Sequence, residues 1–175
     1  MDRSGRSGCP IILTLETLGD RWSLIVIRDI MFGSRRHYRD LLNKSEEGIA
    51  SNILTSRLKK LVDAGLLSKD QDPAHKQKTI YSLTEPAIQL VPLLAMMGPR
   101  GARHTSASRE LSVRAKLLED GGPLMWDIFM EELRPIHLGG GKPERSVIRE
   151  LNTAYEAATA RKGSTAALAP VVQAE

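Results

Sequence analysis

The sequence lacks several features that would assign it to common classes of protein. It has a single cysteine among 175 residues, so it cannot form an internal disulfide bond. No apolar run approaches the roughly 18 residues that a membrane-spanning helix needs, and residues 1–8 contain no hydrophobic signal core. Together these absences predict a cytoplasmic protein that has no membrane partner.

Signals of catalysis and of metal binding are also weak. The four histidines stand singly, without the paired spacing of a zinc site, and only one cysteine is available as a further ligand. The segment Gly-Gly-Gly-Lys at 139–142 lacks the preceding strand and the Gly-Lys-Ser/Thr order of a phosphate-binding loop. We therefore expect no catalytic residue, no metal, no cofactor and no enzymatic activity.

Positive charge is concentrated in one part of the chain. Between residues 34 and 80 there are ten lysines and arginines against six acidic residues, an excess that equals the +4 net charge of the whole chain. Such a localised excess favours a phosphate-bearing partner such as nucleic acid.

The most informative element is a helix that we expect at residues 50–64. Leu54, Leu58 and Leu61 recur at the helical period, while polar and basic side chains occupy most of the other positions. Gly65 follows where a glycine would end a helix. The pattern predicts a helix with an apolar back and a polar, basic front.

The segments on either side of this helix complete a known DNA-binding arrangement. A short helix at 37–42 precedes it across a glycine-containing turn, which makes a helix-turn-helix. Residues 66–69 and 79–83 are expected to pair as antiparallel strands around a polar loop at 71–78. We therefore predict a mainly α (α+β) fold, a winged helix-turn-helix that binds double-stranded DNA.

Further helices are expected before and after this unit. Residues 11–18 and 22–31 suit two scaffold helices. A further helix is expected from Thr84 to about Met97, in which Pro92 should either cause a kink or fall near a helix boundary. Beyond it, three more helices are expected, at 106–119, 123–134 and 144–160.

The pattern divides the chain into four parts. We expect a mobile arm at 1–8, a winged helix-turn-helix domain with a dimerisation helix at 9–104, a helical C-terminal extension at 105–162 and a disordered tail at 163–175.

The helix after the wing is apolar nearly all round and needs a partner surface, which a second copy of the chain would supply. We expect the C-terminal extension either to clasp the partner subunit, which we favour, or to cover the flank of the domain. The residues expected at the dimer interface are Leu15, Leu18, Leu90, Leu93, Leu94 and Met97.

Individual side chains suggest how DNA would be contacted. Asn52 has an amide that can bridge N6 and N7 of adenine, and the guanidinium of Arg57 can bind guanine. Alternatively, Ser51 caps the helix, Arg57 forms a surface salt bridge, and the basic residues are an ordinary solvated charge run. The residues expected to contact bases or phosphates are Arg35, Arg36, Ser51, Asn52, Thr55, Ser56, Arg57, Lys59, Lys76 and Lys78.

A combined set of motifs in residues 9–104 resembles the HxlR family of bacterial winged helix-turn-helix transcription regulators. The motifs are Cys9-Pro10, Leu18-Gly19-Asp20-Arg21-Trp22, Phe32-Gly33, Leu54-Thr55-Ser56-Arg57-Leu58, Leu61, Gly65-Leu66 and Tyr81-Ser82-Leu83-Thr84.

This resemblance implies a homodimer whose recognition helices enter successive major grooves of a pseudo-palindromic operator, with the wings near the flanking minor grooves. We expect a repressor that acts at the bacterial nucleoid. Some members of the family sense electrophiles or oxidants through an N-terminal cysteine, so Cys9 is a candidate redox sensor. Alternatively, Cys9 is a small apolar residue packed under the first helix.

Two other classes of function remain open. The first is a protein-interaction module that kept the winged fold but lost DNA contact, and the second, weaker one is a small enzyme. Separately, a small-molecule effector could bind near Trp126 in the C-terminal helices.

Overall fold

The computed structural model describes residues 8–73, 75–141 and 143–166, without the side chains of Lys76 and residues 161–166. It divides into two compact units. The first unit consists of the chain up to Gln89 together with residues 136–140. The second unit consists of Leu90–Pro135 together with the residues from Gly141 onward. The predicted arm (1–8) lies almost entirely outside the described residues, as does most of the predicted tail (163–175).

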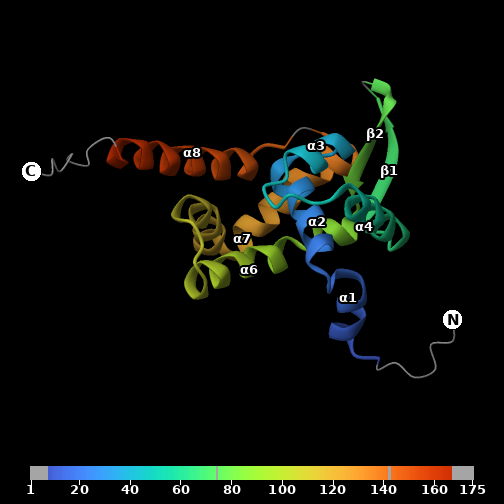
Figure 1. Cartoon of the computed structure of the whole chain (residues 1–175), viewed down its shortest axis with the longest axis horizontal. Coiled ribbons are helices and arrows are strands. Elements are labelled where there is room, and N and C mark those ends of the chain that lie inside the picture. Colours follow the sequence, from blue (N-terminus) through green and yellow to red (C-terminus); the bar gives the residue numbers. More distant parts are fainter. Residues whose placement is uncertain (1–7, 74, 142, 167–175) are drawn as a thin grey trace, which may run out of the picture. The chain divides into compact units, whose positions relative to one another are not determined.

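The first unit is a winged helix, as the sequence predicts. Its hairpin extends from a group of helices (Figure 1). In chain order the elements are α1 (Pro10–Leu18), α2 (Arg21–Gly33), α3 (Tyr38–Asn43), α4 (Ser51–Asp63), β1 (Leu67–Asp72), β2 (His75–Leu83) and α5 (Glu85–Ile88).

The core of this unit forms because α2, α4 and the bases of both strands each present apolar side chains on one side. The exposed side of α4 is polar, which is why the helix packs in one orientation only. Burying each large apolar side chain contributes about 1.5 to 3 kcal/mol. The core side chains with almost no exposure include Val26, Ile27, Ile30, Met31, Leu41, Leu54, Leu58, Leu61, Leu67, Leu83 and Ile88.

The helix α4 ends at a glycine turn. Gly65 has a φ of +70°, which a residue with a Cβ adopts only at a cost. The Leu66 N–H then donates to Leu61 O at 2.9 Å, and the Gly65 N–H donates to Val62 O at 3.0 Å. These two bonds form a Schellman motif, so they satisfy carbonyls that the end of the helix would leave unpaired.

The wing, which we define as the β1–β2 hairpin, is longer than the sequence suggests. The strands pair antiparallel from Leu67 opposite Leu83 to Asp72 opposite His75, with an irregularity next to Gln71. The prediction of a loop at 71–78 is therefore wrong. Polar residues there are compatible with a strand because backbone pairing does not require apolar side chains, and Gln71, His75, Gln77 and Lys78 are exposed to water.

The segment after the wing differs from the single helix expected between Thr84 and Met97. Helix α5 ends at Ile88, and a new helix, α6 (Val91–His104), begins after a break at residues 89–90. Pro92 lies in the first turn of α6, where its missing N–H costs nothing. It therefore falls near a helix boundary, which is the second of the two positions expected for it.

The second unit is helical and contains α6, α7 (Arg109–Leu138, of which the end belongs to the first unit) and α8 (Val147–Ala166). Within the single chain α6 groups with these helices, and the domain boundary expected at 104 stays a prediction. α6 and α7 approach closely, since a Cβ built on Gly98 would lie 2.9 Å from the Cβ of Ala115.

Two of the predicted C-terminal helices are joined in α7, which kinks at Gly122 (φ 55°, ψ −157°) before Pro123. Glu132 is buried and accepts hydrogen bonds from the backbone N–H groups of Val147 and Ile148 at 2.6 and 3.1 Å, which caps the start of α8. Among the described residues, no helix is both long and apolar enough to cross a membrane.

The turn at Gly65 leads to a stability prediction. Gly65→Ala should lower the free energy of unfolding by about 1 to 2 kcal/mol, because a Cβ is strained at this φ although the space around it is open. Gly101→Ala is the matched control, since Gly101 lies inside α6 with nothing near its Cβ position, and it should stabilise by about 0.5 to 1 kcal/mol. Urea titrations of both variants measure the difference. Equal effects of the two substitutions would contradict the account of the turn.

Candidate nucleic-acid interface

The exposed side of α4 carries the polar side chains that the sequence singles out. Ser51, Asn52, Thr55, Ser56 and Lys59 are all exposed. The helix begins at Ser51, and its N-cap is Ala50, which makes no side-chain capping bond. Ser51 is therefore a helical residue and not the cap that we considered as an alternative. From Ser51 to Ser56 the resulting surface is a row of short polar groups, and the one carboxylate of α4, Asp63, lies at the end of the helix, where Lys59 pairs with it.

Tyr38, at the start of α3, holds the first turn of α4. Its hydroxyl donates to Ser51 O at 3.1 Å and lies 3.2 Å from Thr55 Oγ1, which itself donates to Ser51 O at 2.9 Å. The two helices of the helix-turn-helix are thus joined by side-chain hydrogen bonds beside the exposed face. Tyr38 is not among the residues predicted from the sequence, because its partners lie 13 and 17 residues away.

Arg57 forms an ion pair within the chain, as the alternative interpretation of the sequence proposes. Its Nε lies 2.7 Å from Asp20 Oδ1, and Lys60 Nζ lies 3.0 Å from Asp20 Oδ2. Asp20 also accepts from Ser23 at the start of α2. Partial burial raises the pKa of Asp20, but the hydrogen bonds from Ser23, Lys60 and Arg57 outweigh this and hold it well below its usual range. The carboxylate therefore stays charged and joins α2 to α4.

Arg35 and Arg36, predicted to contact phosphates, also have partners inside the first unit. Arg35 Nη1 lies 3.2 Å from Oδ2 of the buried Asp29. Arg36 Nη1 donates to Ile136 O at 2.9 Å and Nε donates to Tyr81 O at 3.3 Å. Burial lowers the pKa of Arg36, an effect that the charge of Asp72 partly offsets. These contacts favour a structural role for both arginines.

His137 lies next to Arg36 and accepts a hydrogen bond from the wing. The Leu83 N–H donates to His137 Nδ1 at 3.3 Å, and the histidine is 9% exposed. Burial lowers the pKa of His137 to about 4, and the nearby charge of Arg36 lowers it further in the same direction. The ring is therefore neutral at physiological pH, which is the state in which Nδ1 can accept.

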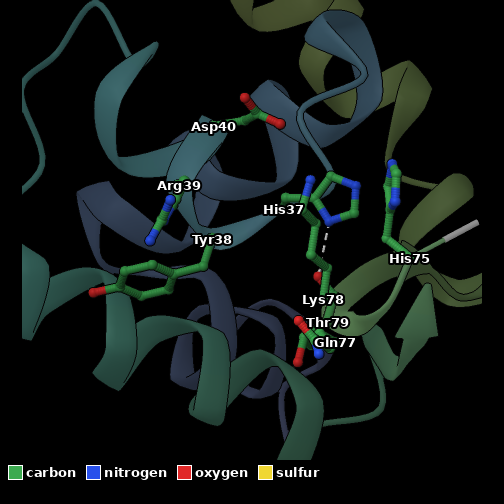
Figure 2. A pocket seen from close by; sticks show the side chains of 8 residues that line it. All are labelled: His37, Tyr38, Arg39, Asp40, His75, Gln77, Lys78 and Thr79. Carbon is green, nitrogen blue, oxygen red and sulfur yellow. Dashed lines mark hydrogen bonds between the residues drawn. The ribbon is translucent and has the colours of Figure 1, made fainter.

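An open groove of about 790 Å³ lies between the start of α3 and the strand β2. His37 spans the groove, because its Nδ1 donates to Thr79 O at 2.9 Å (Figure 2). Its Nε2 lies 3.3 Å from Asp72 Oδ2. We call this the wing groove, and its lining residues are His37, Tyr38, Arg39, Asp40, His75, Gln77, Lys78 and Thr79.

The residues that line the wing groove carry a net positive charge. Arg39 and Lys78 are exposed and belong to its two sides. Its carboxylate, Asp40, is paired with Lys44 at 2.7 Å, and this hydrogen bond lowers the pKa of Asp40. Lys78 is predicted from the sequence as a DNA contact, whereas Arg39 and His75 are not, because only the fold brings them together with Lys78. An excess of basic residues in the local sequence was the one signal available.

The other predicted residues lie as follows. Lys59 is exposed and pairs with Asp63 one turn away on α4. The side chain of Lys76 is outside the described part of the structure. Cys9 is half-buried at the N-cap of α1, and its redox role stays a prediction. Among the described residues no group of three or more histidine, cysteine or acidic side chains could hold a metal ion.

The residues expected at the dimer interface differ in exposure. Leu18 is 5% exposed, so it is already covered within the single chain and we remove it from the expected interface. Leu15 on α1 is exposed, as are Leu93 and Met97 on α6. Leu90 and Leu94 are half-buried.

Comparison with known proteins gives consistent matches. The profile of a family described as HxlR-like helix-turn-helix matches residues 17–109. An uncharacterised HTH-type transcriptional regulator of Synechocystis sp. is 31% identical over 94 residues, which are 54% of this chain and 68% of that protein. YdeP, an uncharacterised HTH-type transcriptional regulator of Bacillus subtilis, is 28% identical over 111 residues, which are 62% of this chain and 84% of that protein.

A solved structure is also similar. The crystal structure of PA1607, described as a candidate transcription factor, superposes with a TM-score of 0.54 at 29% sequence identity, covering 62% of this chain and 73% of that one. The matched family and the relatives consist of transcriptional regulators and not of enzymes, in agreement with the expectation from the sequence.

The buried His137 leads to a pH prediction. An unfolded histidine has a pKa near 6.5, whereas the pKa of His137 in the folded chain is about 4, so between these values the unfolded chain binds more protons. The free energy of unfolding should therefore fall as the pH decreases from about 6.5 to 4, by about 3 kcal/mol in total. His137→Asn, which keeps an acceptor but does not titrate, should show a smaller decrease in urea titrations. The same pH slope in both proteins would contradict this prediction.

Proposed function

The chain belongs to the HxlR-like helix-turn-helix family, and we propose that it regulates transcription by binding a pseudo-palindromic operator as a homodimer. We propose repression through occupation of promoter DNA, at the nucleoid in the bacterial cytoplasm. One observation carries the proposal. The polar face of α4 is exposed, the one carboxylate of this helix, Asp63, is paired with Lys59 at its end, and Tyr38 joins its first turn to the positively charged wing groove.

We assign base contacts to the exposed face of α4, which would enter the major groove. Asn52 is exposed near the start of the helix, where its amide N–H can donate to adenine N7 while its amide oxygen accepts from the N6 amino group. Ser51, Thr55 and Ser56 are short enough to contact base edges or phosphates. Arg57 would have to leave Asp20 to reach a guanine, so we assign it the role of orienting α4.

We assign phosphate contacts to the wing and the wing groove. A DNA backbone that passed along the wing groove would lie between Arg39 on one side and Lys78 on the other. Lys59 and Lys76 are further candidates for phosphate contacts, because they belong to α4 and β2, the two elements that we propose contact the DNA duplex. Such contacts position the protein on the duplex without selecting sequence.

This division of roles can be tested with two substitutions. Asn52→Ala should cost about 1 to 3 kcal/mol on the best operator sequence and little on a scrambled duplex, because only a base contact depends on sequence. Lys78→Ala should weaken both duplexes alike and make the salt dependence of binding shallower by about one unit of slope. Fluorescence anisotropy titrations at several salt concentrations measure both effects. If Asn52→Ala weakened both duplexes equally, Asn52 would be a backbone contact.

The proposed dimer would bury exposed apolar side chains. Leu93 and Met97 are 42% and 46% exposed on one turn of α6, and Met96 beside them is also exposed. Leu15 gives α1 an exposed apolar side chain of the same kind. Covering each large side chain in a second copy contributes about 1.5 to 3 kcal/mol, so a few of them suffice for a stable dimer.

The dimer interface leads to a further prediction. The double variant Leu93→Glu, Met97→Glu should sediment as a monomer and bind the operator more weakly, because each subunit would then hold one half-site alone. Leu124→Glu is the matched control, since Leu124 is exposed on α7 outside the proposed interface, and it should remain a dimer. Analytical ultracentrifugation measures the states. A monomeric unmodified protein, or a dimeric double variant, would rule out this interface.

A further inference from the structure

The C-terminal end of α7 completes the winged unit. Residues 136–140 belong to the first unit, although the match to the family profile ends at residue 109. The part of the chain that lies beyond the family match thus supplies a piece of the winged domain. Its contacts are made with the base of the wing.

The contacts form a closed cluster, which we call the wing-base cluster. Arg36 donates to Ile136 O at 2.9 Å and to Tyr81 O at 3.3 Å, and its third nitrogen donates to Ser82 Oγ. His137 accepts from the Leu83 N–H at 3.3 Å. The members of the wing-base cluster are Arg36, Tyr81, Ser82, Leu83, Ile136 and His137.

These contacts occupy the outer edge of β2. The backbone N–H groups of Tyr81 and Leu83 point to the same edge of the strand, because the two residues are two positions apart. The Tyr81 N–H donates to Arg36 O at 2.8 Å, and the Leu83 N–H donates to His137. The opposite edge pairs with β1. At its base, β2 is therefore held on both edges.

Burial makes this arrangement hard to open. Ser82, Leu83 and His137 are all buried, so an N–H or hydroxyl that lost its partner there would find no water to replace it. The same strand continues outward to Lys78 and Thr79 in the wing groove. The orientation of the wing-base cluster therefore sets the direction in which the wing projects.

We propose that His137 and the backbone of Ile136 are positioning elements for the wing, so that the C-terminal extension of this chain controls how the wing meets DNA. The inference rests on the proposed function, since it assigns the wing a contact with the DNA backbone. In this proposal the C-terminal extension acts on DNA binding through the wing, and neither His137 nor Ile136 needs to touch the nucleic acid.

Three full-length variants test the proposal. His137→Leu removes the acceptor for the Leu83 N–H, and His137→Asn replaces it with an amide oxygen. Trp126→Phe is the matched control, because it removes one hydrogen bond of the C-terminal helices, from Trp126 Nε1 to Leu118 O at 2.7 Å, away from the wing-base cluster. Each is compared with the unmodified protein under conditions where circular dichroism shows all four to be folded.

Two measurements are made on each protein. Amide hydrogen exchange reports whether the base of β2 is held, and anisotropy titrations at several salt concentrations report affinity for an operator duplex and a scrambled one. His137→Leu should accelerate exchange at Leu83, weaken both duplexes about five- to tenfold and reduce the salt slope. His137→Asn should restore all three values, and Trp126→Phe should leave them unchanged.

The outcomes separate the inference from the proposed function. If His137→Leu accelerates exchange but binds both duplexes like the unmodified protein with the same salt slope, His137 is only structural and the proposal is overturned. Equal weakening by Trp126→Phe would overturn it as well, since the effect would then be general destabilisation. If the unmodified protein binds no duplex at low salt, the proposed function itself fails.

Discussion

The carboxylate of Asp20 joins the start of α2 to the helix that we propose contacts DNA. It accepts from the backbone N–H groups of Trp22 and Ser23 at 3.1 and 3.0 Å, which caps α2. The same group binds Arg57 and Lys60, both on α4. Because the charge is held in place by bonds from two helices, it fixes the rotation of α4 about its axis as well as its position.

That rotation decides which side chains face outward. With Arg57 turned toward Asp20 and the leucines turned toward the core, the short polar residues of α4 remain exposed. Tyr38 fixes the first turn of the same helix from α3. Basic residues thus serve two purposes in this unit. Some hold the scaffold together, and others, such as Arg39 and Lys78, remain available on the wing groove.

A second set of contacts determines the wing. His37 bonds both strands of the hairpin, through Thr79 O and Asp72, and the wing-base cluster holds the inner end of β2. The polar outer part of the hairpin has no such support from apolar packing, so its direction depends on these anchors. α4 and the wing are consequently oriented by different residues, Asp20 for the helix and the pair Arg36 and His137 for the strand.

Sequence alone predicts the features that depend on local periodicity. The apolar repeat of α4, its end at Gly65 and the presence of a two-stranded wing are all confirmed. The partners of the arginines were not predictable, because Arg57 and Asp20 are 37 residues apart and Arg36 and Ile136 are 100 apart. No local pattern encodes such contacts. The same reason explains why the wing groove was seen only as a general excess of positive charge.

Base recognition by α4 in a dimer can be tested directly by selecting bound DNA from a pool of random duplexes with the full-length protein. A winged-helix dimer that contacts bases through α4 should enrich sequences with two inverted half-sites whose centres lie about 10 base pairs apart, or a multiple of that spacing. Enrichment of no sequence over the starting pool would contradict base recognition by α4. Enrichment of one asymmetric half-site would contradict the dimer.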